Sequence, residues 1–376
     1  MTKLDGKKVL IAAGGTGGHI NPALAVGGYI RDNCPGAQVV YVGTKDKMEA
    51  TLVPQAGFEL RTIVISGFRR SFAPDAIIHN LKTLLYLFKS MRQSKKIIRD
   101  YKPDLVIGFG GYVSGPVLRT AAKMGIPTAV HEQNAFPGVT NKALAGKVDR
   151  VMLTAPEAEK YMKCKNKPVV TGLPIRGDIL KANRDLSRFE LGLDDKPLVL
   201  SMGGSLGAKP VNDAVLGMIK DTYSAKDRWY LHATGKGGTW FTGKLEEAGV
   251  KLSENPQIKI EEYIDVPKCL PAADVVICRA GASSISEIQA LGKPSILIPS
   301  PYVAENHQYH NAMALVNRGA AVILEEKNLT PATLTEAVND LLSNPEKLAE
   351  IGKNAKAMAV TDASERIFKE LCAILP

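Results

Sequence analysis

Residues 7–18 read KKVLIAAGGTGG, an apolar run that leads directly into a glycine-rich loop. The outline of this stretch returns at residues 196–207, which read KPLVLSMGGSLG. Each copy has the pattern of a buried strand that feeds a glycine loop and then a helix. A repeated strand–loop–helix unit is typical of doubly wound α/β folds.

Two further pairs of segments match in the same order along the chain. Residues 104–111 (DLVIGFGG) correspond to residues 274–281 (DVVICRAG), and residues 125–130 (GIPTAV) correspond to residues 292–297 (GKPSIL). Three matches in one order predict two similar α/β domains in tandem. Each is expected to be a Rossmann-like, doubly wound, mostly parallel sheet.

The composition is that of an ordinary globular protein, because 45% of the 376 residues are hydrophobic and 23% are charged. The periodicity breaks near residues 168–188, so we expect domains at residues 1–175 and 176–355. A C-terminal helix at about residues 355–376 can pack back on the first domain. Ligands of doubly wound sheets bind outside the carboxyl ends of the strands, so we also expect an interdomain cleft.

The cysteines and the N-terminal region bear on the compartment. Five scattered cysteines without a CxxC pair give no sign of a zinc or redox centre and fit a reducing compartment. The apolar run Val9–Ala13 is too short for the core of a signal peptide. We therefore expect a cytoplasmic location.

The positive charge is concentrated in the first half of the chain. Residues 1–175 carry 25 basic and 12 acidic side chains, whereas residues 176–376 carry 23 and 26. Residues 61–102 alone carry 10 basic and 2 acidic side chains. This asymmetry indicates an anionic partner: nucleic acid, an anionic membrane or a polyphosphate ligand. The basic residues alternate with aliphatic ones and not with a stacking platform, which argues against nucleic acid.

A helix is predicted from Asp75 onward, and its apolar residues cover about half of its circumference. These residues are Ile77, Ile78, Leu81, Leu84, Leu85, Leu87, Phe88 and Met91. Phe72 precedes them, and the basic residues around them are Arg69, Arg70, Lys82, Lys89, Arg92, Lys95 and Lys96. Two interpretations are open: a surface that lies on anionic lipid, or a helix buried against its own sheet with solvated lysines.

Two glycine loops of the first half are candidate ligand sites. Residues 14–19 (GGTGGH) and 110–116 (GGYVSGP) each follow a predicted strand and precede a helix. Free backbone N–H groups at a helix start suit a diphosphate, although a simple tight turn is the alternative for either loop alone. His19 ends the first loop, where a base of near-neutral pKa would face the cleft. His131 can simply be packed in the core.

In the second half, residues 279–287 (RAGASSISE) also follow a predicted strand and open a helix. Their backbone N–H groups can hold a phosphate. Glu287 can accept hydrogen bonds from a ribose diol, or it can form a capping box with Ser284. Residues 305–311 (ENHQYHN) carry neutral hydrogen-bonding side chains suited to sugar hydroxyls. His307 and His310 lack a third ligand for a metal.

Taken together, residues 14–19, 110–116, 131–134 (HEQN), 203–205 (GGS) and 279–287 resemble the MurG family. Its members are the bacterial N-acetylglucosaminyltransferases that convert lipid I into lipid II. The resemblance covers nearly the whole chain and implies a GT-B fold with UDP-N-acetylglucosamine as donor, bound by the C-terminal domain.

The resemblance further implies that the N-terminal domain takes the acceptor, an undecaprenyl-diphosphate-linked muramyl peptide. It implies a peripheral enzyme of peptidoglycan biosynthesis, at the cytoplasmic face of the cell membrane. Residues about 69–96 would contact that membrane.

The resemblance assigns a set of residues to the donor. They are Thr16, Gly17, Gly18, Asn134, Arg176, Ser205, Ile264, Ala282, Ser283, Ser284, Ile285, Ser286, Glu287 and Gln308. Ile264 would contact the uracil, Glu287 the ribose and Gln308 the sugar, while Arg176 and Ser205 would help to neutralise the diphosphate. Asn306-His307 departs from the more usual Arg-Gln of the family.

The reaction implied is a single inverting displacement. The 4-hydroxyl of the N-acetylmuramyl unit attacks the anomeric carbon of the donor, UDP departs, and a β-1,4 bond forms. His19 is the first candidate for the base and Glu132 the second. The chain has no Asp-x-Asp motif, so we expect no metal or other cofactor, with the diphosphate held by helix ends and Arg176.

Rival functions remain within and outside the same fold. A diacylglycerol glycosyltransferase would use a similar donor site, and a UDP-N-acetylglucosamine 2-epimerase would need no membrane patch. A non-catalytic UDP-sugar-binding protein is the alternative from another functional class.

Overall fold

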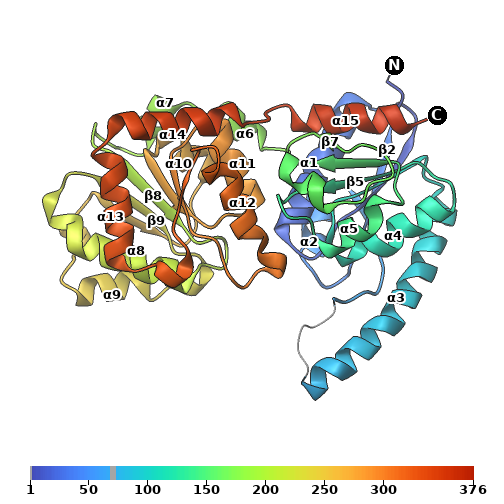
Figure 1. The fold of residues 1–376 in the computed structure, drawn as a ribbon, viewed down its shortest axis with the longest axis horizontal. Helices are drawn as coiled ribbons and strands as arrows, with labels where there is room; N and C mark the ends of the chain where they lie inside the picture. Colours follow the sequence, from blue (N-terminus) through green and yellow to red (C-terminus); the bar gives the residue numbers. More distant parts are fainter. Residues whose placement is uncertain (1, 68–72) are drawn as a thin grey trace. The chain divides into compact units, whose positions relative to one another are not determined.

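The computed structural model describes residues 2–67 and 73–376. Arg69, Arg70 and Phe72 of the predicted membrane surface lie outside the described residues, and so do the side chains of Ile77, Ile78, Leu81, Lys82 and Leu84. The chain divides into two compact units. Unit 1 comprises Met1–Ile175 and Asp362–Pro376, and unit 2 comprises Arg176–Thr361. In both units, helices cover a central sheet (Figure 1).

Unit 1 contains a seven-stranded sheet with the order β3-β2-β1-β4-β5-β6-β7, in which every pairing is parallel. The strands are β1 (Lys8–Ala12), β2 (Gln38–Gly43), β3 (Glu59–Thr62), β4 (Leu105–Gly108), β5 (Thr128–Glu132), β6 (Arg150–Leu153) and β7 (Val169–Val170). The central strands are apolar because helices cover both of their faces. The order reverses direction at β1, so β1 and β4 flank the point where ligands of such sheets bind.

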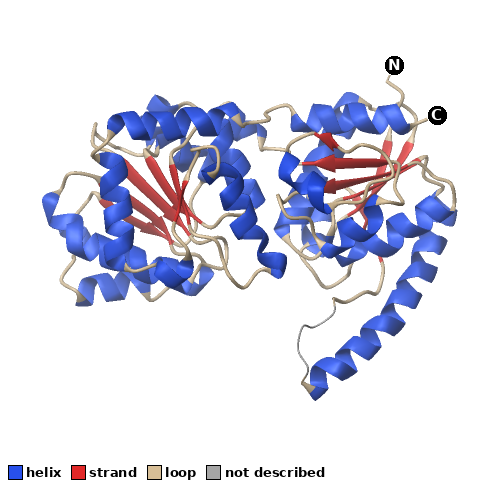
Figure 2. Cartoon of the chain, in the orientation of Figure 1, coloured by secondary structure: helices blue, strands red, loops and turns tan. Residues whose placement is uncertain are grey.

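The helices of unit 1 surround this sheet (Figure 2). They are α1 (Gly17–Asn33), α2 (Glu49–Gln55), α3 (Pro74–Tyr101), α4 (Gly111–Lys123), α5 (Val139–Ala145), the 3₁₀ turn η1 (Pro156–Tyr161) and α15 (Ala363–Ile374). The last helix, α15, buries Ile367 and Leu371 in one hydrophobic cluster with Ile11 and Ile107. The end of the chain is therefore part of the core of unit 1.

Unit 2 contains a six-stranded parallel sheet with the order β10-β9-β8-β11-β12-β13. Its strands are β8 (Leu198–Met202), β9 (Trp229–Ala233), β10 (Ile258–Glu261), β11 (Val275–Cys278), β12 (Ser295–Leu297) and β13 (Val322–Ile323). Its α-helices are α6 (Gly177–Leu180), α7 (Arg184–Glu190), α8 (Lys209–Thr222), α9 (Phe241–Glu247), α10 (Val266–Ala272), α11 (Ala282–Leu291), α12 (His307–Val316), α13 (Pro331–Leu342) and α14 (Pro345–Ala357). Unit 2 also contains short 3₁₀ turns.

The repeat predicted from the sequence is visible in matching hydrogen bonds. The Asp104 carboxylate accepts a 2.8 Å hydrogen bond from the Lys8 N–H, and the Asp274 carboxylate accepts one of 2.8 Å from the Leu198 N–H. Asp104 thus ties the start of β4 to the start of β1, and Asp274 ties the start of β11 to the start of β8. The predicted class of fold, with two Rossmann-like parallel-sheet domains, is confirmed.

Candidate active site

The candidate residues of unit 1 follow the carboxyl ends of neighbouring parallel strands. The first glycine loop follows β1, Glu49 begins the helix that follows β2, the second glycine loop follows β4, and Asn134 follows β5. Because all these strands are parallel, their carboxyl ends lie at one edge of the sheet. The topology therefore places these loops together at that edge.

The first glycine loop leads into α1 without a side-chain cap. Thr16 is the N-cap residue, its side chain makes no capping hydrogen bond, and the first turn contains no acidic residue. Gly15 has a φ of 92°, a conformation that favours glycine. Thr16 and Gly18 are exposed and Gly17 is half-buried, so this helix start presents backbone N–H groups at the surface.

His19 is held by the loop that precedes it. Its Nδ1 lies 3.2 Å from the Gly14 carbonyl oxygen and 3.1 Å from the Thr16 hydroxyl. When Nδ1 donates to the carbonyl, the lone pair of the neutral ring is on Nε2. A ring in that tautomer can accept a proton from a substrate hydroxyl through Nε2.

The second glycine loop packs directly against the first. A Cβ atom at Gly111 would lie 2.4 Å from the Gly14 carbonyl oxygen, and one at Gly110 would lie 3.0 Å from His19 Cδ2. Both glycines also have positive φ, at 90° for Gly110 and 73° for Gly111. Glycine is required here because the loop must approach the imidazole and the Gly14 carbonyl so closely.

Glu132 is buried and surrounded by donors. One carboxylate oxygen accepts from the Asn134 N–H (2.9 Å) and from its side-chain amide (3.2 Å). The other accepts from the Gly138 N–H (3.1 Å) and from Asn141 Nδ2 (2.8 Å). Burial raises the pKa of Glu132, and these hydrogen bonds oppose that shift. A carboxylate that is 1% exposed and has four donors suits the organisation of its loop better than proton transfer with a substrate.

His131 is a packed core residue. It is fully buried, its Nε2 lies 2.8 Å from the Gly172 carbonyl oxygen, and burial lowers its pKa to about 4. The ring is therefore neutral at physiological pH.

Two buried residues at this edge were not among the site residues predicted from the sequence. Asn141 links the His131 carbonyl (3.2 Å) to Glu132. Glu49 accepts hydrogen bonds from the Gly15 N–H (3.1 Å) and the Thr44 N–H (2.9 Å). The signal available for Glu49 was its position just after the second predicted strand, which leads to the same edge as the glycine loops.

In unit 2 the candidate residues also follow the carboxyl ends of parallel strands. Ser205 follows β8, Ile264 follows β10, Ala282 to Glu287 follow β11, and Gln308 follows β12. The carbonyl oxygen of Ser205 accepts from the Lys236 N–H at 3.2 Å, which ties the β8 loop to the β9 loop. The half-buried Ile264 lies in the loop between β10 and α10.

Arg176 and Glu287 form an ion pair. Arg176 Nε donates to Glu287 Oε1 at 3.0 Å, and Nη2 lies 2.9 Å from the same oxygen. Burial raises the pKa of Glu287, and the guanidinium opposes the shift. The sequence-based assignment gave these residues separate parts of the donor, whereas the structure pairs them with each other. A ribose would have to share the Glu287 carboxylate with Arg176.

The N-terminus of α11 is not the one that the capping-box alternative requires. Its N-cap residue is Gly281, with no side-chain capping bond and no acidic residue in the first turn. Because Ser284 lies inside the helix and is not its N-cap, a capping box of Ser284 and Glu287 is wrong. Ile285 and Ser286 are buried, at 6% and 5% exposure, whereas Ala282, Ser283 and Ser284 are half-buried. The residues at the helix start are thus the accessible ones.

Gln308 is positioned by the loop after β12. Its side-chain oxygen accepts a 2.9 Å hydrogen bond from the Ser300 N–H, which directs the amide nitrogen to other acceptors. Glu305 and Asn306, just before α12, have left-handed φ values of 56° and 49°. His307 is held by the Ala304 carbonyl oxygen at 2.9 Å from Nδ1.

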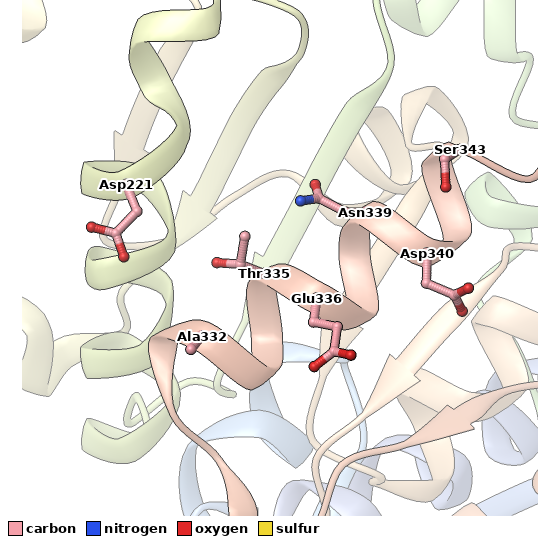
Figure 3. Close-up of a pocket in the computed structure, with 7 residues that line it drawn as sticks. All are labelled: Asp221, Ala332, Thr335, Glu336, Asn339, Asp340 and Ser343. Atoms are coloured by element: carbon pink, nitrogen blue, oxygen red, sulfur yellow. The ribbon is translucent and has the colours of Figure 1, made fainter.

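A surface pocket of unit 2 is a poor candidate for a nucleotide. Figure 3 shows its seven lining residues, which come from α8 and α13 and the residue that follows α13: Asp221, Ala332, Thr335, Glu336, Asn339, Asp340 and Ser343. Three of them are carboxylates and none is basic, so the pocket would repel a diphosphate. Within the described residues, no group of three or more His, Cys, Asp or Glu side chains could hold a metal ion.

A tandem pair of parallel-sheet units with glycine loops at their carboxyl edges is the architecture of a GT-B glycosyltransferase. Comparison with family models supports this class. Residues 9–153 match the glycosyltransferase family 28 N-terminal domain, and residues 198–367 match the glycosyltransferase family 28 C-terminal domain. The chain belongs to glycosyltransferase family 28.

Similar proteins of known name give the finer comparison. The chain is 48% identical to UDP-N-acetylglucosamine--N-acetylmuramyl-(pentapeptide) pyrophosphoryl-undecaprenol N-acetylglucosamine transferase of Acetivibrio thermocellus, over 96% of each chain. It is 43% identical to the transferase of the same name from Ruminiclostridium cellulolyticum, over 96% of this chain and 98% of that one. Among solved structures, Acinetobacter baumannii MurG matches with a TM-score of 0.78 and 28% identity, over 97% of this chain and 99% of that chain.

The first prediction concerns UDP. The resemblance assigns Glu287 to the ribose of the donor, so Glu287→Ala is expected to weaken UDP binding by about 10- to 100-fold through the loss of charge-assisted hydrogen bonds. Titration calorimetry with UDP measures the change. Glu336→Ala, in the acidic pocket of the same unit, is the control and should leave the affinity unchanged. Equal affinities of Glu287→Ala and the wild type, with the fold intact, would remove Glu287 from the donor site.

Proposed function

We propose that the chain transfers N-acetylglucosamine from UDP-N-acetylglucosamine to the 4-hydroxyl of the N-acetylmuramyl unit of lipid I. The product is the β-1,4-linked disaccharide of lipid II, in peptidoglycan biosynthesis. The observation that carries the proposal is the 48% identity, over 96% of each chain, with a transferase named for this reaction. The paired glycine loops and the α11 start supply the chemistry that such a reaction needs.

Unit 2 binds the donor in this proposal. The uncapped N-terminus of α11, at Ala282, Ser283 and Ser284, faces the diphosphate with its N–H groups and its positive dipole end. Arg176, half of whose side chain is exposed, adds a guanidinium whose charge the Glu287 carboxylate partly offsets. Together they stabilise the negative charge that develops on the UDP leaving group as its bond to the anomeric carbon breaks.

Three further residues of unit 2 complete the donor contacts. Ile264 offers its backbone to the uracil, Ser205 meets the diphosphate from the β8 loop, and Gln308 donates its amide to the sugar. In unit 1, Asn134 and the loop of Thr16, Gly17 and Gly18 also serve the donor.

Unit 1 supplies the base. His19 Nε2 takes the proton of the attacking 4-hydroxyl as the new bond to the anomeric carbon forms and the bond to the UDP oxygen breaks. The Gly14 carbonyl and the Thr16 hydroxyl hold the ring through Nδ1. Glu132 remains the second candidate, and its four donors assign it more readily to the shape of the Asn134 loop.

Thermal unfolding distinguishes a UDP-sugar site from the rival functions. UDP should raise the melting temperature more than UMP, because the second phosphate meets the α11 start and Arg176. ATP and an oligonucleotide should give smaller shifts. Protection by the oligonucleotide alone would instead favour a nucleic-acid binder.

The second prediction tests the base. His19→Ala is expected to lower turnover about 100-fold or more while leaving the affinity for UDP nearly unchanged. Steady-state kinetics on a lipid I analogue, with calorimetry for UDP, gives both quantities. An equally large loss of UDP affinity would mean that His19 shapes the loop, and the role of base would pass to Glu132.

The helix α3 supports a peripheral membrane contact because two of its large apolar side chains, Leu85 and Phe88, face the solvent. Leu85 and Phe88 are 68% and 62% exposed, whereas Thr83, Ser90 and Ser94 on the same helix are at most 2% exposed. A core-facing helix has the reverse distribution. No helix within residues 2–67 and 73–376 is long and apolar enough to cross a membrane.

Exposed basic residues accompany these apolar side chains. Lys89, Arg92, Lys95 and Lys96 are all exposed. Apolar residues that enter the interface together with cations that meet anionic headgroups are typical of a helix lying on a membrane. We therefore propose that α3 docks unit 1 on the anionic cytoplasmic face of the cell membrane, where the lipid-linked acceptor is found.

The third prediction tests this surface. Each basic residue near anionic lipid contributes about 1 kcal/mol, so changing Lys89, Arg92 and Lys96 together to Glu should release the protein from anionic vesicles. Sedimentation with vesicles at moderate salt measures binding, and turnover on a water-soluble acceptor should survive.

A control with the same change in charge isolates the position. In this control variant, three exposed lysines elsewhere in unit 1 are changed to Glu: Lys147, Lys163 and Lys167. This variant should still sediment with the vesicles. If the α3 variant also sediments as the wild type does, α3 is not the docking surface.

A further inference from the structure

A buried carboxylate lies beneath the first glycine loop. Glu49 is 0% exposed and is the first residue of α2, just after the loop that follows β2. Its Oε2 accepts a 3.1 Å hydrogen bond from the Gly15 N–H. Its Oε1 accepts from the Thr44 N–H at 2.9 Å and from the Thr44 hydroxyl at 2.7 Å. One carboxylate therefore joins the loop after β1 to the loop after β2.

The neighbouring backbone leaves room for this side chain. A Cβ atom at Gly14 would lie 2.7 Å from Glu49 Oε1, and one at Gly43 would lie 2.5 Å from Glu49 Cγ. Any larger residue at either position would displace the carboxylate from its hydrogen bonds. The glycines on both sides are thus matched to Glu49.

Burying a carboxylate is costly unless hydrogen bonds compensate it, and here three donors do so. Gly15, which provides one of them, lies between the two groups that hold the His19 imidazole. Those groups are the Gly14 carbonyl and the Thr16 hydroxyl, at 3.2 Å and 3.1 Å from Nδ1. A shift of Gly15 would therefore move both of these groups relative to the imidazole.

We propose that Glu49 is a positioning residue, which fixes the first glycine loop so that His19 is oriented for proton transfer. The inference rests on the proposed function, since it assigns Glu49 a role in the same reaction. Glu49 acts through Gly15 and meets no substrate. A displacement of the base by about 1 Å is enough to lower turnover by roughly 100-fold, so a residue of this kind affects rate more than binding.

The variant Glu49→Gln keeps the shape of the side chain but turns one acceptor oxygen into an NH₂ group, which faces a donor. We expect the turnover number on a water-soluble lipid I analogue to fall about 10-fold or more, with the KM for UDP-N-acetylglucosamine within about 2-fold of wild type. In a His19→Ala background the same substitution should lower turnover by less than about 2-fold, because the residue it positions is absent.

Two further variants separate positioning from stability. Asp104→Asn alters the carboxylate that accepts from the Lys8 N–H at the start of β1. It should lower the melting temperature, and its effect on turnover should not depend on whether His19 is present. Thr44→Val removes only the hydroxyl contact and should give a smaller loss of the same kind. It also keeps the test available if Glu49→Gln does not fold.

Hydrogen exchange supplies a readout that does not depend on activity. Amides of residues 14–19 should exchange faster in Glu49→Gln than in the wild type, and not in Asp104→Asn. Unchanged exchange in that segment, or equal losses of turnover with and without His19, would overturn the positioning role. A wild-type protein that fails to transfer the sugar while the exchange result holds would instead overturn the proposed function.

Discussion

The approach of two glycine loops at one edge of the unit 1 sheet is the constraint on which the candidate active site depends. A side chain at Gly111 would collide with the Gly14 carbonyl, 2.4 Å from its Cβ, and one at Gly110 would press on the His19 ring. Because both loops follow adjacent parallel strands, the sheet itself brings them together. The same closeness holds His19 beside a helix start whose N–H groups have no side-chain cap.

The two units use the same fold for different chemistry. Unit 1 places two buried carboxylates, Glu49 and Glu132, under the loops of its edge, and each accepts backbone N–H groups. We propose that these buried carboxylates fix the loops around His19. Unit 2 places an exposed arginine and an uncapped helix start at the corresponding edge, a combination suited to a diphosphate. The difference in charge between the halves of the chain has its counterpart in α3, with its exposed lysines and apolar side chains.

The sequence predicted the features that are local in the chain. Strand–loop–helix repeats gave both sheets, because buried strands and glycine loops have short, recognisable patterns. Contacts between distant residues could not be predicted in the same way. Arg176 and Glu287 pair across 111 residues, and Glu49 meets Gly15 across 34. Such pairs depend on how the loops meet in space, and a charged residue in a loop has many possible partners. The capping box failed for a local reason, because the N-cap of α11 is Gly281 and not Ser284.

Transfer of N-acetylglucosamine to lipid I by this chain is tested most directly by following a label on the sugar. UDP-N-acetylglucosamine labelled in the sugar is incubated with the full-length protein and a lipid I analogue. We predict one labelled disaccharide, joined by a β-1,4 bond, for each UDP released. Binding of UDP without transfer would contradict this prediction and favour a non-catalytic binder. Transfer to diacylglycerol and not to the lipid I analogue would contradict it as well.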